Sequence, residues 1–252
     1  MPAGLIVTGA SRGIGAATAR LAGRRGYGVC VNYVNDCVAA TRVVEAIRGE
    51  GGRAVAVRAD VADPDQVRRL FDMAEAELGS INAVVNNAGI TGPIGNFAAA
   101  SPETLRRVFD VNVLGSLFCA QEAVRRFTGR AGSGAHGGPS VIVNISSVAA
   151  STGAPGEYVH YAASKAAIES FTLGLARETA ASGIRVNAVS PGSTLTDIHA
   201  TAGEPDRPAR IRSRIPMGRL AEPEEIAEAV LWLLSDSASY VTGAVLRAGG
   251  GF

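Results

Sequence analysis

Apolar residues along this chain follow two patterns: short continuous runs, and longer stretches in which they recur every three or four positions. The first pattern is typical of buried parallel strands, and the second of helices that cover them. The predicted strands are the run that begins at Leu5 and the segments Val29–Tyr33, Arg53–Ala59, Ile81–Val85, Ser140–Ile145, Ile184–Val189 and Gly243–Arg247. Strands and helical stretches alternate. The chain is therefore predicted to be an α/β protein with a doubly wound parallel sheet of about seven strands and helices on both faces.

The helical pattern places the main helices between these strands. The predicted helices are Ala16–Arg25, Cys37–Glu50, Thr104–Phe127, Tyr158–Ala181 and Glu222–Ser235. Asp63–Pro64 and Ser101–Pro102 each pair a capping side chain with a proline, which is typical of a helix start. The glycine-rich segment Thr128–Pro139 is predicted to be a surface loop within a single domain that spans residues 1–252.

The first predicted strand runs directly into a turn that contains Gly9, Gly13 and Gly15. Glycine allows a tight turn, lets a diphosphate approach the backbone and lets the next helix pack closely on the strand. The helix that begins near Gly13 would direct free N–H groups and the positive end of its dipole at phosphates. The motif indicates a dinucleotide site, although plain strand-to-helix connectors also use such turns.

Composition and charge narrow the class of protein. The chain has 252 residues, 47% hydrophobic and 19% charged, which is enough to bury a full core in one globular domain. The net charge is +1 and nothing forms a dense basic face, so nucleic acid is not an expected partner. Cys30, Cys37 and Cys119 are odd in number and dispersed, as expected of reduced, buried thiols. No stretch reaches the roughly 18 apolar residues of a membrane span, so we expect a cytoplasmic protein without a membrane partner.

Tyr161 and Lys165 are four residues apart and therefore share one face of a predicted helix. A tyrosine hydroxyl has a pKa of about 10 and needs a nearby cation to exchange protons near neutrality. By itself this spacing is most often an ordinary surface pair. However, the helix follows the strand that ends at Ser146 and Ser147, and that end faces the same crevice as the glycine turn.

Together these motifs resemble those of the short-chain dehydrogenase/reductase family, over the whole chain. Thr8–Gly15 is similar to the cofactor turn of that family, and Asn86–Gly89 to its sheet-stabilising motif. Its catalytic set is matched by Asn112, Ser147, Tyr161 and Lys165. The resemblance implies a Rossmann-type fold. The run Val159–Lys165 is particularly similar to the glucose 1-dehydrogenases of the family.

The family mechanism implies a role for each matched residue. Tyr161 would pass a proton to or from the substrate oxygen as hydride moves between the substrate carbon and nicotinamide, and Ser147 would orient that oxygen. Lys165 would lower the pKa of Tyr161 and bind the nicotinamide ribose. Asn112 would hold a water that relays protons from Lys165 to solvent; its alternative is a polar bridge across a helix kink. For Ser146, the preferred role is that of a hydrogen-bond partner of the backbone and not a catalytic one.

The resemblance also implies contacts to the cofactor from residues at the strand ends. Besides Tyr161 and Lys165, these are Gly9, Ser11, Arg12, Gly13, Ile14, Gly15, Asn32, Tyr33, Asp60, Val61, Asn87, Ala88, Gly89, Pro191, Gly192, Thr194 and Thr196. Pro191–Gly192 with Thr196 matches the segment that holds the nicotinamide carboxamide. Asp60 resembles the residue that hydrogen-bonds the adenine, with a helix cap or a loop salt bridge as alternatives.

The choice of cofactor depends on the end of the second predicted strand. Tyr33 stands where NAD-preferring relatives place an acidic residue, and Arg12 can reach the same corner with a guanidinium suited to a phosphate. Both features favour NADP over NAD. The alternative for Arg12 is a solvated residue of the turn.

The segment 193–220 is less regular, and by the resemblance it forms a mobile lid over the substrate. It carries four arginines that could recognise an anionic substrate, but for which a solvated helix face is the preferred interpretation. These are Arg207, Arg210, Arg212 and Arg214.

The three histidines give no sign of a metal site. His136, His160 and His199 lack the paired spacing of metal ligands, so no metal is predicted. His160 and Glu157 are close enough to Tyr161 in the sequence to reach a substrate pocket.

The sequence thus predicts an NADP-dependent oxidoreductase that acts on a small ketone or secondary alcohol, including a sugar or other polyol. A 3-oxoacyl carrier-protein reductase is the alternative within this class. A regulatory protein that binds NADP without catalysis is an alternative from another class, although it would need only the glycine turn. The family is usually tetrameric, and the helices Thr104–Phe127 and Tyr158–Ala181 are apolar around much of their circumference, so we expect a homotetramer.

Overall fold

The computed structural model of the protein describes residues 4–131 and 140–252, and its centre is a parallel sheet of seven strands. The strand order is β3-β2-β1-β4-β5-β6-β7. The strands are β1 (Gly4–Val7), β2 (Gly28–Tyr33), β3 (Arg53–Arg58), β4 (Ile81–Asn86), β5 (Ser140–Ile145), β6 (Ile184–Pro191) and β7 (Val245–Ala248). The predicted doubly wound fold is confirmed. The last strand begins at Val245 and not at Gly243, because Gly243 adopts a turn conformation with φ +76° and donates its N–H to Val186 O.

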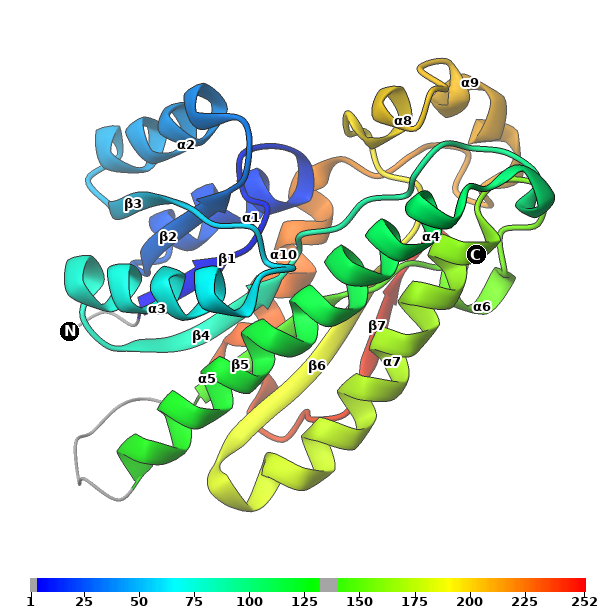
Figure 1. The fold of residues 1–252 in the computed structure, drawn as a ribbon. Helices are drawn as coiled ribbons and strands as arrows, with labels where there is room; N and C mark the ends of the chain where they lie inside the picture. The colour runs from blue at the N-terminus through cyan, green and yellow to red at the C-terminus, as the bar shows by residue number, and fades with distance from the viewer. Residues whose placement is uncertain (1–3, 132–139) are drawn as a thin grey trace.

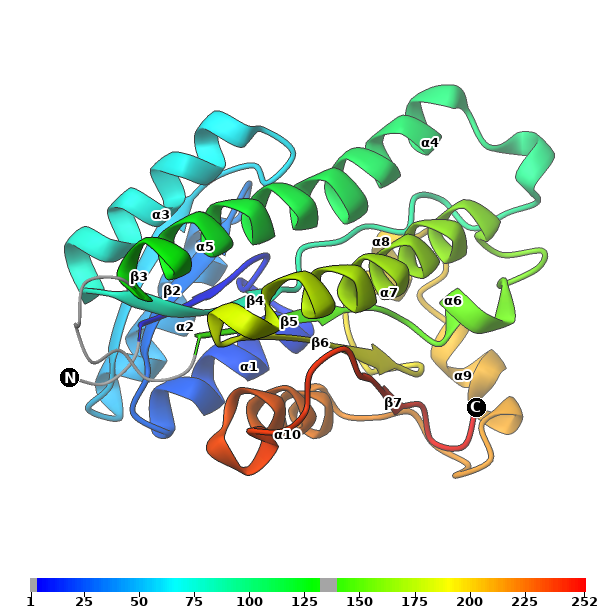
Figure 2. The ribbon, with the colours of Figure 1, turned by 90° about the horizontal axis from the view of Figure 1, so that it is seen from below.

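Helices cover both faces of the sheet (Figures 1 and 2). One face carries α1 (Gly13–Arg24), α2 (Cys37–Gly49) and α10 (Pro223–Leu234), and the other carries α3 (Pro64–Leu78), α5 (Gly115–Ala131) and α7 (Val159–Thr179). Successive side chains of a strand point to opposite faces, so Leu5 and Val7 enter one core and Ile6 the other. This explains why the strands are continuous apolar runs.

Capping side chains fix where several helices begin. The Asp36 carboxylate accepts a hydrogen bond from Ala39 N at the start of α2, at 2.9 Å. Asp63 does the same for α3, which has Pro64 as its first residue. Ser101 caps α4 (Pro102–Phe109). The Asp63 and Ser101 starts are those predicted from the sequence.

The predicted uninterrupted helix Thr104–Phe127 is wrong in its middle. The helix α4 ends at Phe109, residues 110–114 form one wider π-helical turn, and α5 begins at Gly115. A Cβ on Gly115 would lie 2.6 Å from Val61 Cγ2, so the chain passes very close to the loop after β3 at this point. π turns inside helices are frequent at functional sites.

The helix α5 also continues beyond its predicted end, so the loop prediction for Thr128–Ala131 is wrong. Thr128 Oγ1 donates to Val124 O at 2.8 Å, an arrangement that keeps this hydroxyl within the helix. The remainder of the predicted loop, residues 132–139 with His136, lies outside the described residues.

Three short helices lie at the end of the molecule where α4 begins: α6 (Ala149–Thr152), α8 (Ile198–Thr201) and α9 (Arg207–Ile211) (Figure 1). The segment 193–220 contains α8 and α9, and it leaves and rejoins the body of the protein at one place. Thr194 pairs with Ala221 in an isolated parallel bridge, and Leu195 N donates to Ala221 O at 2.9 Å. The two ends of the segment are therefore held together while its helices project over the strand ends.

The cysteines and the apolar character of the helices were the subject of two expectations from composition. Cys30 and Cys119 are buried as expected, and burial raises the pKa of both thiols. The expectation is wrong for Cys37, which is the exposed first residue of α2. Within residues 4–131 and 140–252, no helix has the length and apolar character needed to cross a membrane.

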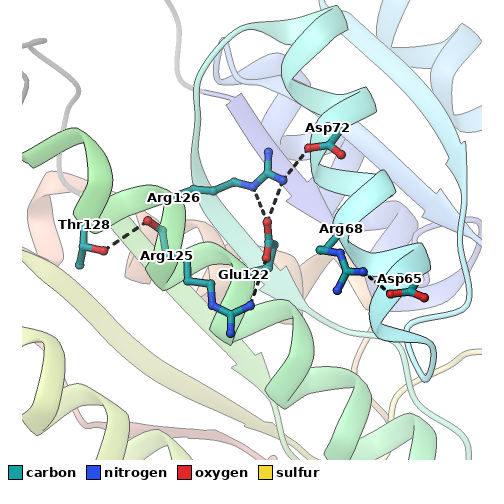
Figure 3. A network of polar contacts seen from close by, with 7 residues as sticks. All are labelled: Asp65, Arg68, Asp72, Glu122, Arg125, Arg126 and Thr128. Carbon is teal, nitrogen blue, oxygen red and sulfur yellow. Dashed lines mark hydrogen bonds and ion pairs between the residues drawn. The ribbon is translucent and has the colours of Figure 1, made fainter.

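A network of ion pairs ties α3 to α5 (Figure 3). The Arg126 guanidinium contacts carboxylate oxygens of Glu122 and Asp72 at 2.7 Å and of Glu75 at 2.5 Å. Burial alone would lower the pKa of Arg126, but the hydrogen bonds that it donates to these three carboxylates raise its pKa above the usual value. The guanidinium carbon also lies 5.4 Å from the centre of the Phe71 ring. One cation thus holds together three acids from two helices.

We expect Arg126→Ala to lower the free energy of unfolding by roughly 1–3 kcal/mol, because it removes the cation that three neighbouring carboxylates share. The matched control is Arg125→Ala, since Arg125 is 62% exposed and approaches Glu122 only to 3.8 Å. It should change stability by less than about 0.5 kcal/mol. Urea unfolding of both variants measures the difference, and equal losses would show that the network does not stabilise the packing of α3 on α5.

Candidate active site

A cavity of about 620 Å³ opens at the carboxyl ends of the strands, where the strand order reverses between β1 and β4. Ligands of open α/β sheets bind in this crevice. All residues predicted to touch a cofactor or to take part in catalysis line the cavity, with the exceptions of Gly15 and Asn112. The geometry therefore brings together groups that come from most of the length of the chain.

The glycine turn fits closely against the end of β4. Gly9 and Gly13 adopt φ values of +60° and +54°, which favour glycine. A Cβ on Gly15 would lie 2.4 Å from Asn87 Nδ2, and one on Gly9 would lie 2.9 Å from Ala88 Cα. Gly15 therefore packs beneath the turn and does not face the cavity, so its predicted contact with a cofactor is replaced by a packing role.

Thr8 and Asn87 fasten this turn to β4, and we call their four hydrogen bonds the Thr8–Asn87 clasp. The Thr8 hydroxyl oxygen accepts from Asn87 N at 2.9 Å and from Ala88 N at 3.0 Å. In return, Asn87 Nδ2 donates to Thr8 O at 2.8 Å and to Gly9 O at 3.1 Å. Asn87 also lines the cavity, but its amide nitrogen is engaged in shaping the turn.

Asn32 fastens the other side of the turn. Its Oδ1 accepts from Gly9 N at 3.2 Å, and its Nδ2 donates to Ala59 O at 3.0 Å and to Val57 O at 3.3 Å. The side chain lines the cavity but is committed to backbone groups of the turn and of β3. The contacts of Asn32 therefore indicate that it shapes the site, rather than that it binds a ligand.

The start of α1 fits a diphosphate. Its N-cap residue Arg12 makes no side-chain hydrogen bond to the first turn, and that turn contains no acidic side chain. Free N–H groups at Gly13 and Ile14 therefore meet the cavity at the positive end of a 12-residue helix. These N–H groups are suited to bind an anion directly, because no capping side chain stands between them and the cavity.

One corner of the cavity contains two charged residues that the sequence analysis did not assign to the site, Asp36 and Arg107. Arg107 Nη2 lies 2.9 Å from Asp60 Oδ2, while Asp60 Oδ1 accepts from Ala62 N. The loop salt bridge considered for Asp60 is thus present. Asp36 could have been found as the cap of a predicted helix, whereas Arg107 is one of several polar positions on α4 and gives no signal.

The predicted nicotinamide segment leads from β6 into the segment 193–220. Pro191 ends β6, and Gly192 N donates to Ala248 O at 2.8 Å. The methyl carbon of Thr196 would lie 3.1 Å from a Cβ on Gly13, so this segment directly borders the glycine turn. The segment after β6 therefore forms the wall of the cavity between the ends of β1 and β6.

Tyr161 lies in the first turn of α7, buried beside Ser147. Burial raises the pKa of its hydroxyl above the usual value, and the hydrogen bond with Ser147 offsets only part of this effect. Ser147 Oγ also accepts from Ala149 N at 3.1 Å, which fixes its orientation. Two hydroxyls thus converge on one point of the cavity wall, and the phenol is protonated at neutral pH.

Lys165 is the single lysine of a chain that has 23 arginines. Its ammonium group donates to Ile145 O at 2.7 Å and lies 5.6 Å from the centre of the Tyr161 ring. Burial lowers its pKa to about 8. Arginine could not lose its proton at such a pH, so this position holds a cation whose charge can change. Burial raises the pKa of the Tyr161 phenol in this structure, and a lowering of that pKa by Lys165 stays a prediction.

Asn112 lies in the π turn and is fully buried. Its Oδ1 accepts from Ile90 N at 2.8 Å, and its Nδ2 donates to Ile90 O at 2.9 Å and to Ser164 Oγ at 3.0 Å. These contacts form the polar bridge across a helix kink that was one of its two interpretations. They connect the chain after β4 to α7 directly behind Lys165.

Ser146 points toward α7. Its hydroxyl donates to Glu169 Oε1 at 2.8 Å, and it lies 3.4 Å from Lys165 O. The interpretation of Ser146 as a partner of the backbone agrees with the longer contact to Lys165 O, whereas the shorter hydrogen bond is to a side chain, that of Glu169. Glu169 was not identified from the sequence, because it is one polar residue on a helix with many.

Two arginines of the segment 193–220 line the cavity, Arg207 and Arg214, and the first of them is buried in its wall. Arg207 is only 8% exposed, and its Nη2 lies 2.6 Å from both Glu157 Oε2 and Tyr158 OH. The preferred interpretation of a solvated face is therefore wrong for Arg207, because the partly buried carboxylate of Glu157 and the phenol of Tyr158 bind it on the inner side of the segment. It holds for the other three arginines of the segment, which are exposed: Arg210, Arg212 and Arg214.

Glu157 lines the cavity, as its place in the sequence suggested, but His160 does not. The Nε2 atom of His160 lies 2.8 Å from Thr91 O, so the ring anchors the chain after β4. Within the described part of the chain, no three His, Cys, Asp or Glu side chains are grouped so that they could hold a metal ion. The side chain of His199 is outside the described residues.

The buried lysine predicts a specific pH dependence of stability. Its pKa is about 8 in the folded protein and about 10.4 when unfolded, so between these values the unfolded state binds more protons and stability rises with pH. Below pH 8 Lys165 is charged in the folded protein, and its burial then lowers the free energy of unfolding by the full amount. We expect the free energy of unfolding, relative to that of Lys165→Met, to increase by about 3 kcal/mol from pH 7 to about pH 10.5.

Urea unfolding of both proteins across this range measures the effect. No other lysine titrates here, and the comparison with Lys165→Met cancels the contribution of tyrosines and cysteines. A difference that does not depend on pH would show that Lys165 has an ordinary pKa in the folded state.

Comparison with known proteins places this geometry in a family. The family model described as enoyl-(acyl carrier protein) reductase matches residues 9–252. The chain is 47% identical to the uncharacterized oxidoreductase YgfF of Escherichia coli over 246 residues, or 98% of each chain. It is 44% identical to the cis-4-hydroxycyclohexanecarboxylate dehydrogenase of Sinomonas cyclohexanicum, over 98% of this chain and 95% of that one.

Solved structures agree with the sequence relatives. A short chain dehydrogenase from Burkholderia cenocepacia in complex with NADP has a TM-score of 0.88 and 33% identity, over 98% of this chain and 96% of its own. A 3-ketoacyl-(acyl-carrier-protein) reductase from Brucella melitensis complexed with NADH has a TM-score of 0.87 and 32% identity, over 99% and 97%. The chain therefore belongs to the short-chain dehydrogenase/reductase family of oxidoreductase enzymes.

Proposed function

We propose that this protein is an NADP-dependent oxidoreductase that transfers hydride between nicotinamide and a small ketone or secondary alcohol. The observation that carries the proposal is one continuous cavity that holds the glycine turn at one end and Ser147, Tyr161 and Lys165 at the other. A dinucleotide laid from the turn toward Tyr161 would present its nicotinamide beside the two hydroxyls. When bound, it supplies or accepts the hydride.

The chain itself would supply the proton and orient the substrate. In the reducing direction, Tyr161 donates its phenolic proton to the substrate oxygen, for which the raised pKa keeps it protonated at neutral pH. Ser147 donates a hydrogen bond to the same oxygen and polarises the carbonyl. In the oxidising direction Tyr161 must first lose its proton, so alcohol oxidation should gain rate as the pH rises.

Lys165 would hold the cofactor ribose and replace the proton that Tyr161 gives up. Its pKa of about 8 allows both charge states near neutrality, which a relay requires. The Asn112 bridge packs directly behind Lys165. A path past Asn112, by which water relays protons from Lys165 to solvent, is part of the proposal. A chain that bound NADP only for regulation would not need the convergence of Ser147, Tyr161 and Lys165.

The segment 193–220 would act as a lid in a single domain. Its ends are joined at Thr194 and Ala221, while α8 and α9 contribute Ile198, Arg207 and Ile211 to the cavity. Such an arrangement lets the middle of the segment move while its ends stay fixed. Closure over a substrate would exclude water from the hydride transfer.

The substrate end of the cavity favours a compact carbon skeleton. Ala154 and Tyr158 pack around Tyr161, and Ile94, Ile198 and Ile211 also line the cavity. The relative from Sinomonas cyclohexanicum is named for a compact alicyclic substrate, a hydroxycyclohexanecarboxylate. A sugar would need polar partners here, and the charged pair of Glu157 and Arg207 is one such partner.

A 3-oxoacyl carrier-protein reductase remains the second candidate, because the solved structure from Brucella melitensis carries that activity in its name. Following NADPH oxidation across a panel of alicyclic ketones, sugars and acetoacetyl thioesters separates the two. Preference for the thioesters would favour the second candidate.

A homotetramer is also part of the proposal. Large apolar side chains are exposed on α7, α10 and the C-terminal edge of the sheet, and they include Leu173, Trp232 and Val245. Exposed apolar surface of this kind is typical of contacts between subunits.

Tyr161→Phe keeps the ring but removes the hydroxyl that transfers the proton. We expect turnover to fall by at least about 100-fold while the affinity for NADPH stays nearly unchanged. Steady-state kinetics and fluorescence titration of NADPH measure the two quantities. Retained turnover would overturn the assignment of Tyr161 as the proton donor.

The preference for NADP over NAD rests on the corner formed by Tyr33 and Arg12. Arg12 is exposed and free to turn toward a 2′-phosphate, and no acid stands at Tyr33. Asp36 works in the opposite direction, because its carboxylate lines the same cavity. It is engaged in capping α2, which directs one oxygen toward Ala39 N.

We expect kcat/KM to be at least about tenfold higher with NADPH than with NADH, equivalent to roughly 1.4 kcal/mol. Tyr33→Asp combined with Arg12→Ala should reverse this order, because it adds a repelling charge and removes the attracting one. Asp36→Asn is the control: it keeps the cap and should raise the preference for NADPH. Equal efficiency with the two cofactors in the unmodified enzyme would contradict the role of this corner.

A further inference from the structure

An ion pair largely shielded from solvent joins the segment 193–220 to Glu157, two residues before α7. Arg207 of α9 lies 2.6 Å from Glu157, and their side chains are only 9% and 16% exposed. The second carboxylate oxygen of Glu157 is 3.1 Å from Arg210, whose side chain is 42% exposed. Glu157 would therefore keep a cationic partner even without Arg207.

Arg207 also contacts Tyr158, the N-cap residue of α7. It donates to the Tyr158 hydroxyl at 2.6 Å, and its guanidinium carbon lies 5.2 Å from the centre of that ring. The Tyr158 ring in turn packs edge-on against Tyr161, with centroids 5.2 Å apart and planes at 84°. A continuous chain of contacts thus runs from α9 through Tyr158 to Tyr161.

We propose that Arg207 is a positioning residue that couples the seating of the segment 193–220 to the alignment of Tyr161 through the ring of Tyr158. The inference rests on the proposed function, since it assumes that Tyr161 transfers the proton. When the segment closes, Arg207 reaches Tyr158, and Tyr158 holds Tyr161 toward the substrate. When the segment opens, this support and a nearby positive charge are withdrawn together.

A merely structural role would not require this arrangement. Buried ion pairs contribute little net stability, because desolvation of the charges offsets their attraction. Arg210 already binds Glu157 and Glu204 and could hold the segment from the surface. What Arg207 adds is a cation in contact with the phenol that packs on Tyr161.

The charge of Arg207 acts on both phenols in the same direction. Burial raises the pKa of Tyr158 and of Tyr161, and the positive charge of Arg207 opposes the increase in each. Burial would likewise raise the pKa of Glu157, but Arg207 and Arg210 hold it below its usual value. Glu157 therefore stays ionised and Arg207 stays anchored at the pH of catalysis.

Other charged groups near Tyr161 come from α7 and from the segment 193–220. On α7 itself, Lys165 lies one turn away and His160 is turned toward Thr91 O. From the segment 193–220, Asp197 and Arg214 line the same cavity. Tyr158 itself contacts Arg207 and Glu157, and the carboxylate of Glu157 raises its pKa while the positive charge of Arg207 lowers it. Removal of Arg207 should therefore change the titration of Tyr161 in a way that removal of the other arginines does not.

The test compares Arg207→Gln, Arg207→Lys and Tyr158→Phe with the matched control Arg210→Gln. We expect kcat of Arg207→Gln to fall by about 10- to 100-fold, as for other losses of alignment. The pH at which alcohol oxidation reaches half its maximum should rise by about one unit, because the opposing charge is gone. Arg207→Lys should restore the pH profile, and Arg210→Gln should behave as wild type in both respects.

Tyr158→Phe keeps the ring but breaks the hydrogen bond to Arg207, and it should lower kcat without loss of folding. If the two residues act through one chain of contacts, the double variant Arg207→Gln/Tyr158→Phe should be no slower than the slower single variant. Tyr158→Phe also decides the question if Arg207→Gln fails to fold, since a wild-type kcat in that variant would overturn the proposal.

Three further results would overturn the inference: a wild-type kcat and pH profile in Arg207→Gln, a change confined to KM, or multiplicative effects in the double variant. Failure of the proposed function is recognised separately, because it would appear as retained turnover in Tyr161→Phe. An inactive Tyr161→Phe together with a fully active Arg207→Gln would reject the coupling alone.

Discussion

The close approach of the glycine turn to the end of β4 is the constraint on which the site depends. The Thr8–Asn87 clasp satisfies backbone groups that the switch between β1 and β4 would otherwise leave without partners. This contact is possible only because Gly9 and Gly15 have no side chain to separate the two segments. With the turn fixed in this way, α1 points its free N–H groups into the crevice at the point where the strand order reverses.

The same constraint extends to the opposite half of the sheet. The chain that continues from Asn87 passes Gly89, where a Cβ would lie 3.3 Å from Asn112 Oδ1 and 3.4 Å from Lys165 Nζ. Asn112 then bridges Ile90 to α7 from within the π turn. A single run of residues after β4 therefore fixes the glycine turn and the buried lysine relative to each other, although they lie far apart in the sequence.

Sequence patterns predicted what depends on local order, and missed what depends on tertiary packing. The strands, the capped helix starts and the glycine turn each follow from neighbouring residues, so periodicity and turn chemistry were sufficient. The π turn has no local signal, because Asn112 widens the helix in order to reach Ile90, more than 20 residues away in the sequence. Arg207 was placed on a solvated face because its buried partner Glu157 lies 50 residues earlier. Arg107 was missed for the same reason, since its partner Asp60 is 47 residues away.

Burial has opposite effects on the two groups that would share the proton. It raises the pKa of Tyr161 and lowers that of Lys165, because in each case it disfavours the charged form. At neutral pH the phenol therefore keeps its proton while the amine can lose one, and this combination suits reduction of a ketone.

Oxidation of an alcohol requires a phenol that has lost its proton, and so depends on positive charge near the phenol. In the described structure the cation that contacts the Tyr158–Tyr161 pair from outside α7 is Arg207, and it belongs to the segment 193–220, the proposed lid. If that proposal holds, control of the proton lies partly with the lid and partly with the helix α7.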